Sequence, residues 1–161
     1  MDYNGLKHRA QTLCMYGQTH QRRGNVQHAI GFYSQSIGLY PTAEAYTFRG
    51  WAYSLLGRVD DAIQECKKAI ALDPTFGNPY NDIGAYLLKK GQLDEAIEWL
   101  EKAKAAPRYE PRYFPYMNLG RIYARKGMVL RAIEEFEGAL EMHPGERTCL
   151  SMVTQLRGAL N

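Results

Sequence analysis

The side chains most often used for catalysis and metal binding form no recognisable pattern in this sequence. None of the four histidines is paired with another at a spacing typical of metal ligands: His8, His20, His28 and His143. The P-loop, G-x-G-x-x-G, H-E-x-x-H and G-x-S-x-G motifs are all absent from the sequence. We therefore predict that the chain is not an enzyme and that it binds no metal ion and no cofactor.

The cysteines indicate a reducing environment. They are odd in number, widely separated and free of C-x-x-C pairs: Cys14, Cys66 and Cys149. This pattern argues against a disulfide framework and against a zinc site. The first residues show no apolar segment typical of a signal peptide, and no apolar run approaches the roughly 20 residues of a membrane-spanning helix. We expect a soluble, cytoplasmic protein without membrane contact.

The composition is that of one globular domain. The 161 residues are 23% charged and 45% hydrophobic, a balance typical of folded rather than disordered chains. The formal charge of +3 is mildly basic, and the sequence lacks the concentrated basic stripe of a nucleic-acid-binding protein. Nucleic acid is therefore not the expected partner, and RNA binding remains a lesser alternative because other helical-repeat proteins read RNA.

Three series of small residues divide the chain into repeating units. Two series are glycines and one is alanine, and each steps by 33, 34 and 36 residues: Gly17/Gly50/Gly84/Gly120, Gly24/Gly57/Gly91/Gly127 and Ala29/Ala62/Ala96/Ala132. Self-similarity at a fixed period of this length is the signature of a repeat architecture.

The stretch from Ala45 to Pro74 shows one unit most clearly, as two helices joined by a tight turn. Gly50 lies midway along the first helix, where its missing side chain permits close approach of the second. Gly57 follows the last turn and can take the left-handed conformation that ends a helix. Pro74 then ends the second helix because proline cannot continue it.

This arrangement of recurring glycine, alanine and proline residues resembles the tetratricopeptide repeat, a helix–turn–helix unit of about 34 residues. Four such units cover most of the chain, over residues 10–42, 43–76, 77–110 and 113–146. The resemblance implies an all-α fold, a right-handed α-solenoid of tandem repeats that forms a single domain over residues 1–161. The first unit departs from the family pattern at His20, which takes an aromatic packing position, and at Ser36, which replaces an alanine.

The two ends of the chain are expected to complete the array. Residues 1–9 extend the first helix backward. A solvating helix at 146–160 covers the last apolar face of the stack. Its apolar side is predicted to consist of Leu150, Val153, Leu156 and Leu160.

The resemblance also implies a function, that of a protein–protein interaction scaffold which binds a peptide or partner segment. The first helix of each repeat would line a concave groove. Amides, which can donate to and accept from an extended peptide backbone, recur among the residues predicted to form this groove: Cys14, Gln18, Gln21, Thr47, Trp51, Asn78, Asn81, Met117, Arg121 and Ser151. Trp51 is the expected anchor, and the alternative is that it packs against the next repeat.

One connection departs from the period. Ala106 to Pro115 is two residues longer than the other junctions and unusually aromatic. We predict that its aromatic side chains form a further contact with the partner: Tyr109, Tyr113 and Phe114.

The partner class is only partly predictable. Four cations on the first helices favour acidic ligands weakly: Arg22, Lys89, Arg121 and Arg125. Co-chaperone members of the family hold a partner's terminal carboxylates with basic residues and asparagine. The matching positions here hold Cys14, Gln18, Phe48, Asn78 and Asp82, which argues against that carboxylate clamp. Self-assembly into a homo-oligomer is the main alternative to a peptide groove.

Overall fold

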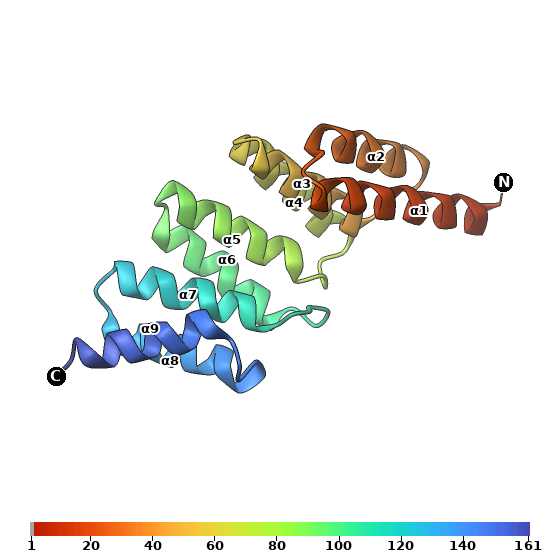
Figure 1. Ribbon diagram of the computed structural model, residues 1–161. Coiled ribbons are helices and arrows are strands. Elements are labelled where there is room, and N and C mark those ends of the chain that lie inside the picture. Colours follow the sequence, from red (N-terminus) through yellow and green to blue (C-terminus); the bar gives the residue numbers. More distant parts are fainter. Residues whose placement is uncertain (1) are drawn as a thin grey trace.

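The computed structural model describes residues 2–161, so Met1, the first residue of the expected helix extension, lies outside the described part. Within residues 2–161 the chain is all α-helical apart from one isolated β-bridge. The helices follow one another in antiparallel pairs (Figure 1): α1 (Tyr3–Arg22), α2 (Val26–Leu39), α3 (Ala43–Leu55), α4 (Val59–Leu72), α5 (Asn78–Lys90), α6 (Leu93–Ala105), α7 (Tyr113–Arg125), α8 (Val129–Met142) and α9 (Arg147–Gly158). The expected all-α repeat solenoid is confirmed.

The glycine at the middle of each first helix marks the point where the second helix crosses it. A Cβ at Gly17 would lie 2.5 Å from Tyr33, and one at Gly84 would lie 2.5 Å from Leu100. Neither side chain can be added without displacing its neighbour. The second glycine series closes the turns, as in Gly57, whose φ of 77° is left-handed.

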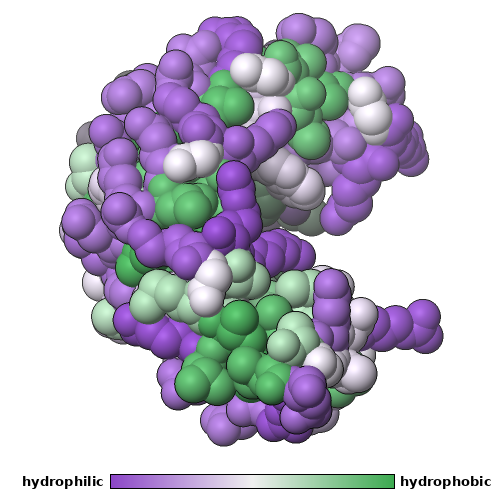
Figure 2. Space-filling model, turned by 90° about the vertical axis from the view of Figure 1, so that its left-hand side faces the viewer, coloured by the Kyte–Doolittle hydropathy of each residue, from purple (hydrophilic) through white to green (hydrophobic). Residues whose placement is uncertain are grey.

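The array is curved because its first helices lie closer to one another than its second helices do. Each first helix packs on its own second helix, and successive first helices also touch one another, as α5 touches α7. In residues 2–161, successive second helices do not approach one another comparably. The first helices therefore lie on the inner side of the curve, and Figure 2 shows the resulting C-shaped outline with one hollowed side.

The two ends of the array differ in how closely they follow the sequence prediction. α1 begins at Tyr3, so the expected extension holds from there. α9 covers the last repeat, but Leu150 and Leu160 are 47% and 53% exposed, so their predicted place on the apolar side is wrong. Val153 is buried as predicted, and Cys149 is buried beside it, because the register of α9 points that face at α8, and Leu160 follows the helix end.

The glycine crossings predict a sharp difference between two alanine substitutions. Gly84→Ala is expected to lower the free energy of unfolding by about 1–3 kcal/mol, because its Cβ would overlap Leu100. Gly38→Ala, in α2, meets nothing within 4 Å and is expected to raise it by about 0.5–1 kcal/mol through lower backbone entropy of the unfolded chain. Urea denaturation of both variants checks this, and equal effects would contradict the close crossing.

Candidate functional site

Two cavities lie around α3 on the concave side. The N-terminal cavity, about 730 Å³, lies between α1 and α3. The second, which we name the aromatic cavity, measures about 430 Å³ and lies between α3, α5 and the connection that precedes α7. Its aromatic lining is Phe48, Trp51, Phe76, Tyr86, Tyr109 and Phe114. Phe48 lines both cavities and so lies at the partition between them.

The long connection between α6 and α7 closes one side of the aromatic cavity because it pairs with the connection between α4 and α5. The backbone N–H of Arg108 donates to the Thr75 carbonyl at 3.0 Å, and the Gly77 N–H donates to the Arg108 carbonyl at 2.8 Å. Tyr109 lies so close under Gly77 that a Cβ there would meet its ring at 2.6 Å. The two connections therefore form one wall.

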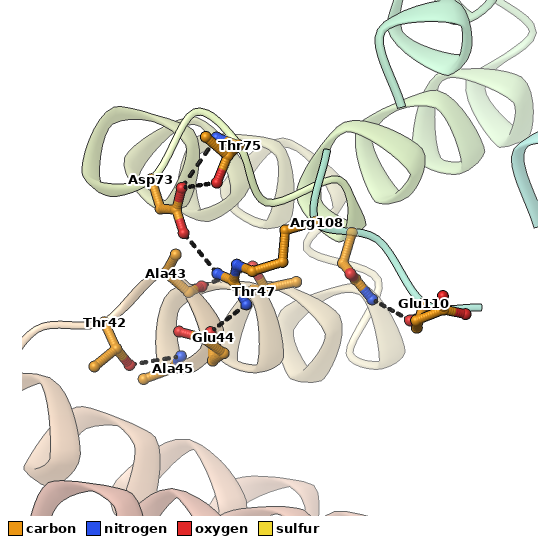
Figure 3. A network of polar contacts seen from close by, with 10 residues as sticks. Thr42, Ala43, Glu44, Ala45, Thr47, Asp73, Thr75, Arg108 and Glu110 are labelled. Atoms are coloured by element: carbon orange, nitrogen blue, oxygen red, sulfur yellow. Dashed lines mark hydrogen bonds and ion pairs between the residues drawn. The ribbon is translucent and has the colours of Figure 1, made fainter. Parts of the chain in front are cut away.

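Arg108 fastens this wall to the first helix of the second repeat (Figure 3). Its Nη1 lies 2.9 Å from Glu44 Oε1 and its Nη2 lies 2.6 Å from Asp73 Oδ2. The guanidinium also stacks 4.2 Å from the centre of the Phe76 ring. Hydrogen bonds from Thr75 and then from Arg108 lower the pKa of Asp73 to about 2, so this carboxylate stays ionised at neutral pH.

The residues predicted for the groove separate into accessible and buried ones. Trp51 is 45% exposed and lines the aromatic cavity together with residues of α5, the first helix of the next repeat. Phe114 is also exposed on this cavity. The other accessible or half-buried positions are Gln18, Asn78, Tyr113, Arg121 and Ser151. Ser151 lies on α9, away from both cavities.

Several residues predicted to contact the ligand are buried and bonded within the protein, although the buried Nε2 of Gln21 has no hydrogen-bond partner among the described residues. Gln21 Oε1 accepts from the Tyr33 hydroxyl at 2.7 Å, and Asn81 Oδ1 accepts from Asn118 Nδ2 at 3.0 Å. The remaining buried positions are Cys14, Thr47, Tyr109 and Met117. The Gln21 bond joins the two helices of the first repeat, and the Asn81 bond joins the neighbouring first helices α5 and α7.

Asp82 is a candidate functional residue that the sequence analysis did not predict for the groove. It lies on α5, lines the aromatic cavity and is only partly accessible. No ion pair among the described residues includes it. Burial among the cavity walls raises the pKa of Asp82 to about 7, against a smaller opposing effect of the Asn81 side chain.

The groups that face Asp82 do not compensate its charge. Burial raises the pKa of Cys66 on α4, of Tyr86 on α5 and of Tyr109 in the wall, so all three are neutral near pH 7. On α3, Glu44 is paired with Arg108. On α7, Arg121 donates from Nη1 to Asn118 Oδ1 at 3.1 Å.

His20 and the three cysteines have packing roles. The His20 ring stacks on Phe32 with centroids 5.1 Å apart, as expected for an aromatic position. All three cysteines are buried free thiols. Across residues 2–161 no three side chains of the metal-binding types come together. None of the described helices has both the length and the apolar character needed to cross a membrane.

Comparison with known proteins identifies the repeats. Tetratricopeptide repeat profiles match residues 43–76, 65–98 and 115–145, which together make more than half of the chain. Small glutamine-rich tetratricopeptide repeat-containing protein 2 of Mycosarcoma maydis is 37% identical over 75 residues, 46% of this chain and 21% of its own length. Human DnaJ homolog subfamily C member 7 is 31% identical over 86 residues, 50% of this chain and 17% of its own.

Solved structures confirm the fold. PilF of Pseudomonas aeruginosa superposes with a TM-score of 0.89 at 22% identity, covering 94% of this chain and 69% of its own. MamA superposes with a TM-score of 0.73 at 25% identity, covering 89% of this chain and 83% of its own. The chain spans only about a fifth of the curated relatives named above. The repeat profiles, the relatives and the fold together establish that this chain belongs to the tetratricopeptide repeat family.

Proposed function

We propose that the protein is a non-enzymatic interaction scaffold that holds an extended segment of a partner protein in its concave groove, with the whole chain acting as one unit. The observation that carries the proposal is Trp51, a large side chain that is 45% exposed on the hollowed side of the solenoid. Exposed tryptophan beside a cavity is the side chain most often found to dominate binding energy at protein interfaces.

The chemistry of the groove supports a segment bound by side-chain insertion. Gln21 and Asn81 each commit a side-chain oxygen to an internal bond, so these two oxygens do not accept from a peptide backbone. The aromatic cavity offers rings for an inserted side chain, whereas the N-terminal cavity mixes apolar groups with amide and charged side chains. A segment that places one side chain in each cavity would cross the partition at Phe48.

A carboxylate clamp of the co-chaperone kind is not part of the proposal. At its matching positions Cys14 is buried, Phe48 is aromatic and Asp82 is an acid. An acid at such a position repels a carboxylate rather than binding it. The resemblance to DnaJ-type relatives therefore supports protein binding in general and not the same ligand.

We also place the protein in the cytoplasm. The three thiols are unpaired, and proteins that keep cysteines in this state are typical of reducing compartments.

A Trp51→Ala variant tests the groove. Peptides selected from a random display library on the wild-type protein are expected to bind Trp51→Ala at least about thirtyfold more weakly, because truncating a hot-spot side chain costs about 2 kcal/mol or more. The matched control is Leu130→Ala, which removes a side chain that is 66% exposed on the second helix of its repeat. Titration by calorimetry gives both affinities. Unchanged affinity for Trp51→Ala with an intact helical spectrum would refute groove binding.

A further inference from the structure

Two features of the aromatic cavity, its rings and its carboxylate, favour the same kind of ligand, a cation. Its walls are mainly aromatic rings, contributed by α3, α5, α7 and the two paired connections. Asp82 contributes a carboxylate to the same lining. The face of an aromatic ring carries negative electrostatic potential, so rings around a carboxylate attract a cation twice over.

We propose that the aromatic cavity receives a lysine or arginine side chain of the bound segment, with Asp82 as its counter-ion and Trp51, Phe76 and Phe114 as aromatic walls. This inference rests on the proposed groove function and specifies its ligand. It reverses the weak preference for acidic ligands that the first-helix cations indicate from sequence alone.

Three cations near the groove make contacts within the protein. Arg108 is held between Glu44 and Asp73, and its charge is balanced there. Arg121 donates to Asn118, and Arg125 donates from Nη1 to the Leu88 carbonyl at 3.1 Å. None of them forms an ion pair with Asp82, so the charge of this carboxylate is available to a ligand.

The dimensions and the desolvation also favour a long cationic side chain. A cavity of about 430 Å³ falls in the usual range of ligand pockets, roughly 300–1,000 Å³. The apolar stem of lysine can lie along the rings while its ammonium reaches the carboxylate. An apolar side chain of equal length would complete the burial of Asp82 without a partner, which is costly for an ionised group.

The pH dependence of binding separates these two occupants. With the pKa of Asp82 near 7, about a tenth of the carboxylate is ionised at pH 6 and about nine tenths at pH 8. A cation binds the ionised form, so its affinity should rise by up to about tenfold between these values. An apolar side chain favours the protonated form, so its affinity should fall over the same interval.

The test uses the peptides Ac-Gly-Ala-Xaa-Ala-Gly-NH₂, where Xaa is lysine, norleucine or glutamate. Binding is followed by the indole N–H signal of Trp51 in ¹⁵N–¹H NMR spectra, assigned with Trp51→Phe. The lysine peptide is expected to bind most tightly and to gain affinity from pH 6 to pH 8. Asp82→Asn should abolish both the lysine preference and the pH dependence, whereas Asp94→Asn, at an exposed acid paired with Lys126, should change neither.

Two outcomes would overturn the inference, and only the second would also overturn the proposed groove function. If lysine and norleucine peptides shift the Trp51 signal with equal affinity at pH 8, the cationic occupant is wrong while groove binding stands. If none of the peptides shifts Trp51, and display-selected peptides also bind independently of Trp51, both the inference and the groove function fail.

Discussion

Replacing Asp82 by asparagine is expected to stabilise the protein at pH 8 by about 2–4 kcal/mol while leaving its stability at pH 4 nearly unchanged. The pKa of this carboxyl is about 7 in the folded protein and about 3.8 when unfolded. The folded state therefore holds the proton more tightly than the unfolded state does. As the pH rises from 4 through 7, the wild type loses stability, and above 7 the loss is complete. Asparagine has no proton to lose.

The measurement is urea denaturation of wild type and variant at pH 4, 6 and 8. Asp73, whose pKa is lowered to about 2, gives both proteins the same opposite trend at still lower pH, so the difference between them isolates Asp82. The matched control is Asp60→Asn, an exposed acid paired with Lys90, which should leave the pH profile unchanged. Parallel profiles for wild type and Asp82→Asn would show that the pKa of Asp82 is not raised in the folded protein.

A gain in stability on removing Asp82 would itself bear on function. Residues that lower stability persist where binding or catalysis needs them. Asp82 lines the same cavity as the exposed Trp51, and replacing it would cost the fold nothing. Its presence is explained if a bound ligand supplies the opposite charge.

The repeats were predictable because their cause is local. Gly50 and Gly84 permit the helix crossings, and Gly57 ends a helix in the left-handed conformation. Each effect acts within one helix pair, and the same residue recurs at each repeat. A period can therefore be recognised without knowing which helices meet.

The site was less predictable because it depends on contacts between repeats. The hydrogen bond between Asn118 and Asn81 joins two first helices, and no single repeat reveals it. The bonds of Arg108 to Glu44 and Asp73 likewise cross repeat boundaries. Only the two extra residues and the aromatic composition of the 106–115 connection signalled that this segment was unusual.

Arg49→Ala is the second substitution with a large expected effect, a loss of about 2–4 kcal/mol in the free energy of unfolding. Arg49 Nε lies 2.7 Å from Glu65 Oε2, and Nη2 lies 3.1 Å from Oε1, so the guanidinium binds both carboxylate oxygens. Glu65 is only 4% exposed. Its remaining partner, Lys68 at 3.1 Å, is more than half exposed and is a weaker compensation for a buried charge.

The near end of the Glu65 side chain is fixed at the helix interface. Its Cβ lies beside the crossing of α3 and α4, where a Cβ at Gly50 would meet it at 3.2 Å. The carboxylate would have to leave this interface to regain full hydration after Arg49 is removed. Because Arg49 also donates to Ser34 Oγ at 3.2 Å, the variant loosens the junction between the first and second repeats as well.

A double-mutant cycle separates the buried charge from the lost packing. Arg49→Leu is expected to destabilise strongly, whereas Arg49→Leu combined with Glu65→Leu should recover to within about 1 kcal/mol of the wild type, since apolar pairs commonly replace buried ion pairs at little cost. Thermal and urea unfolding of the four proteins give the coupling energy. If the double variant is as unstable as the sum of the single ones, the pair acts through packing alone, and the charge of Glu65 does not determine how α3 is held against α4.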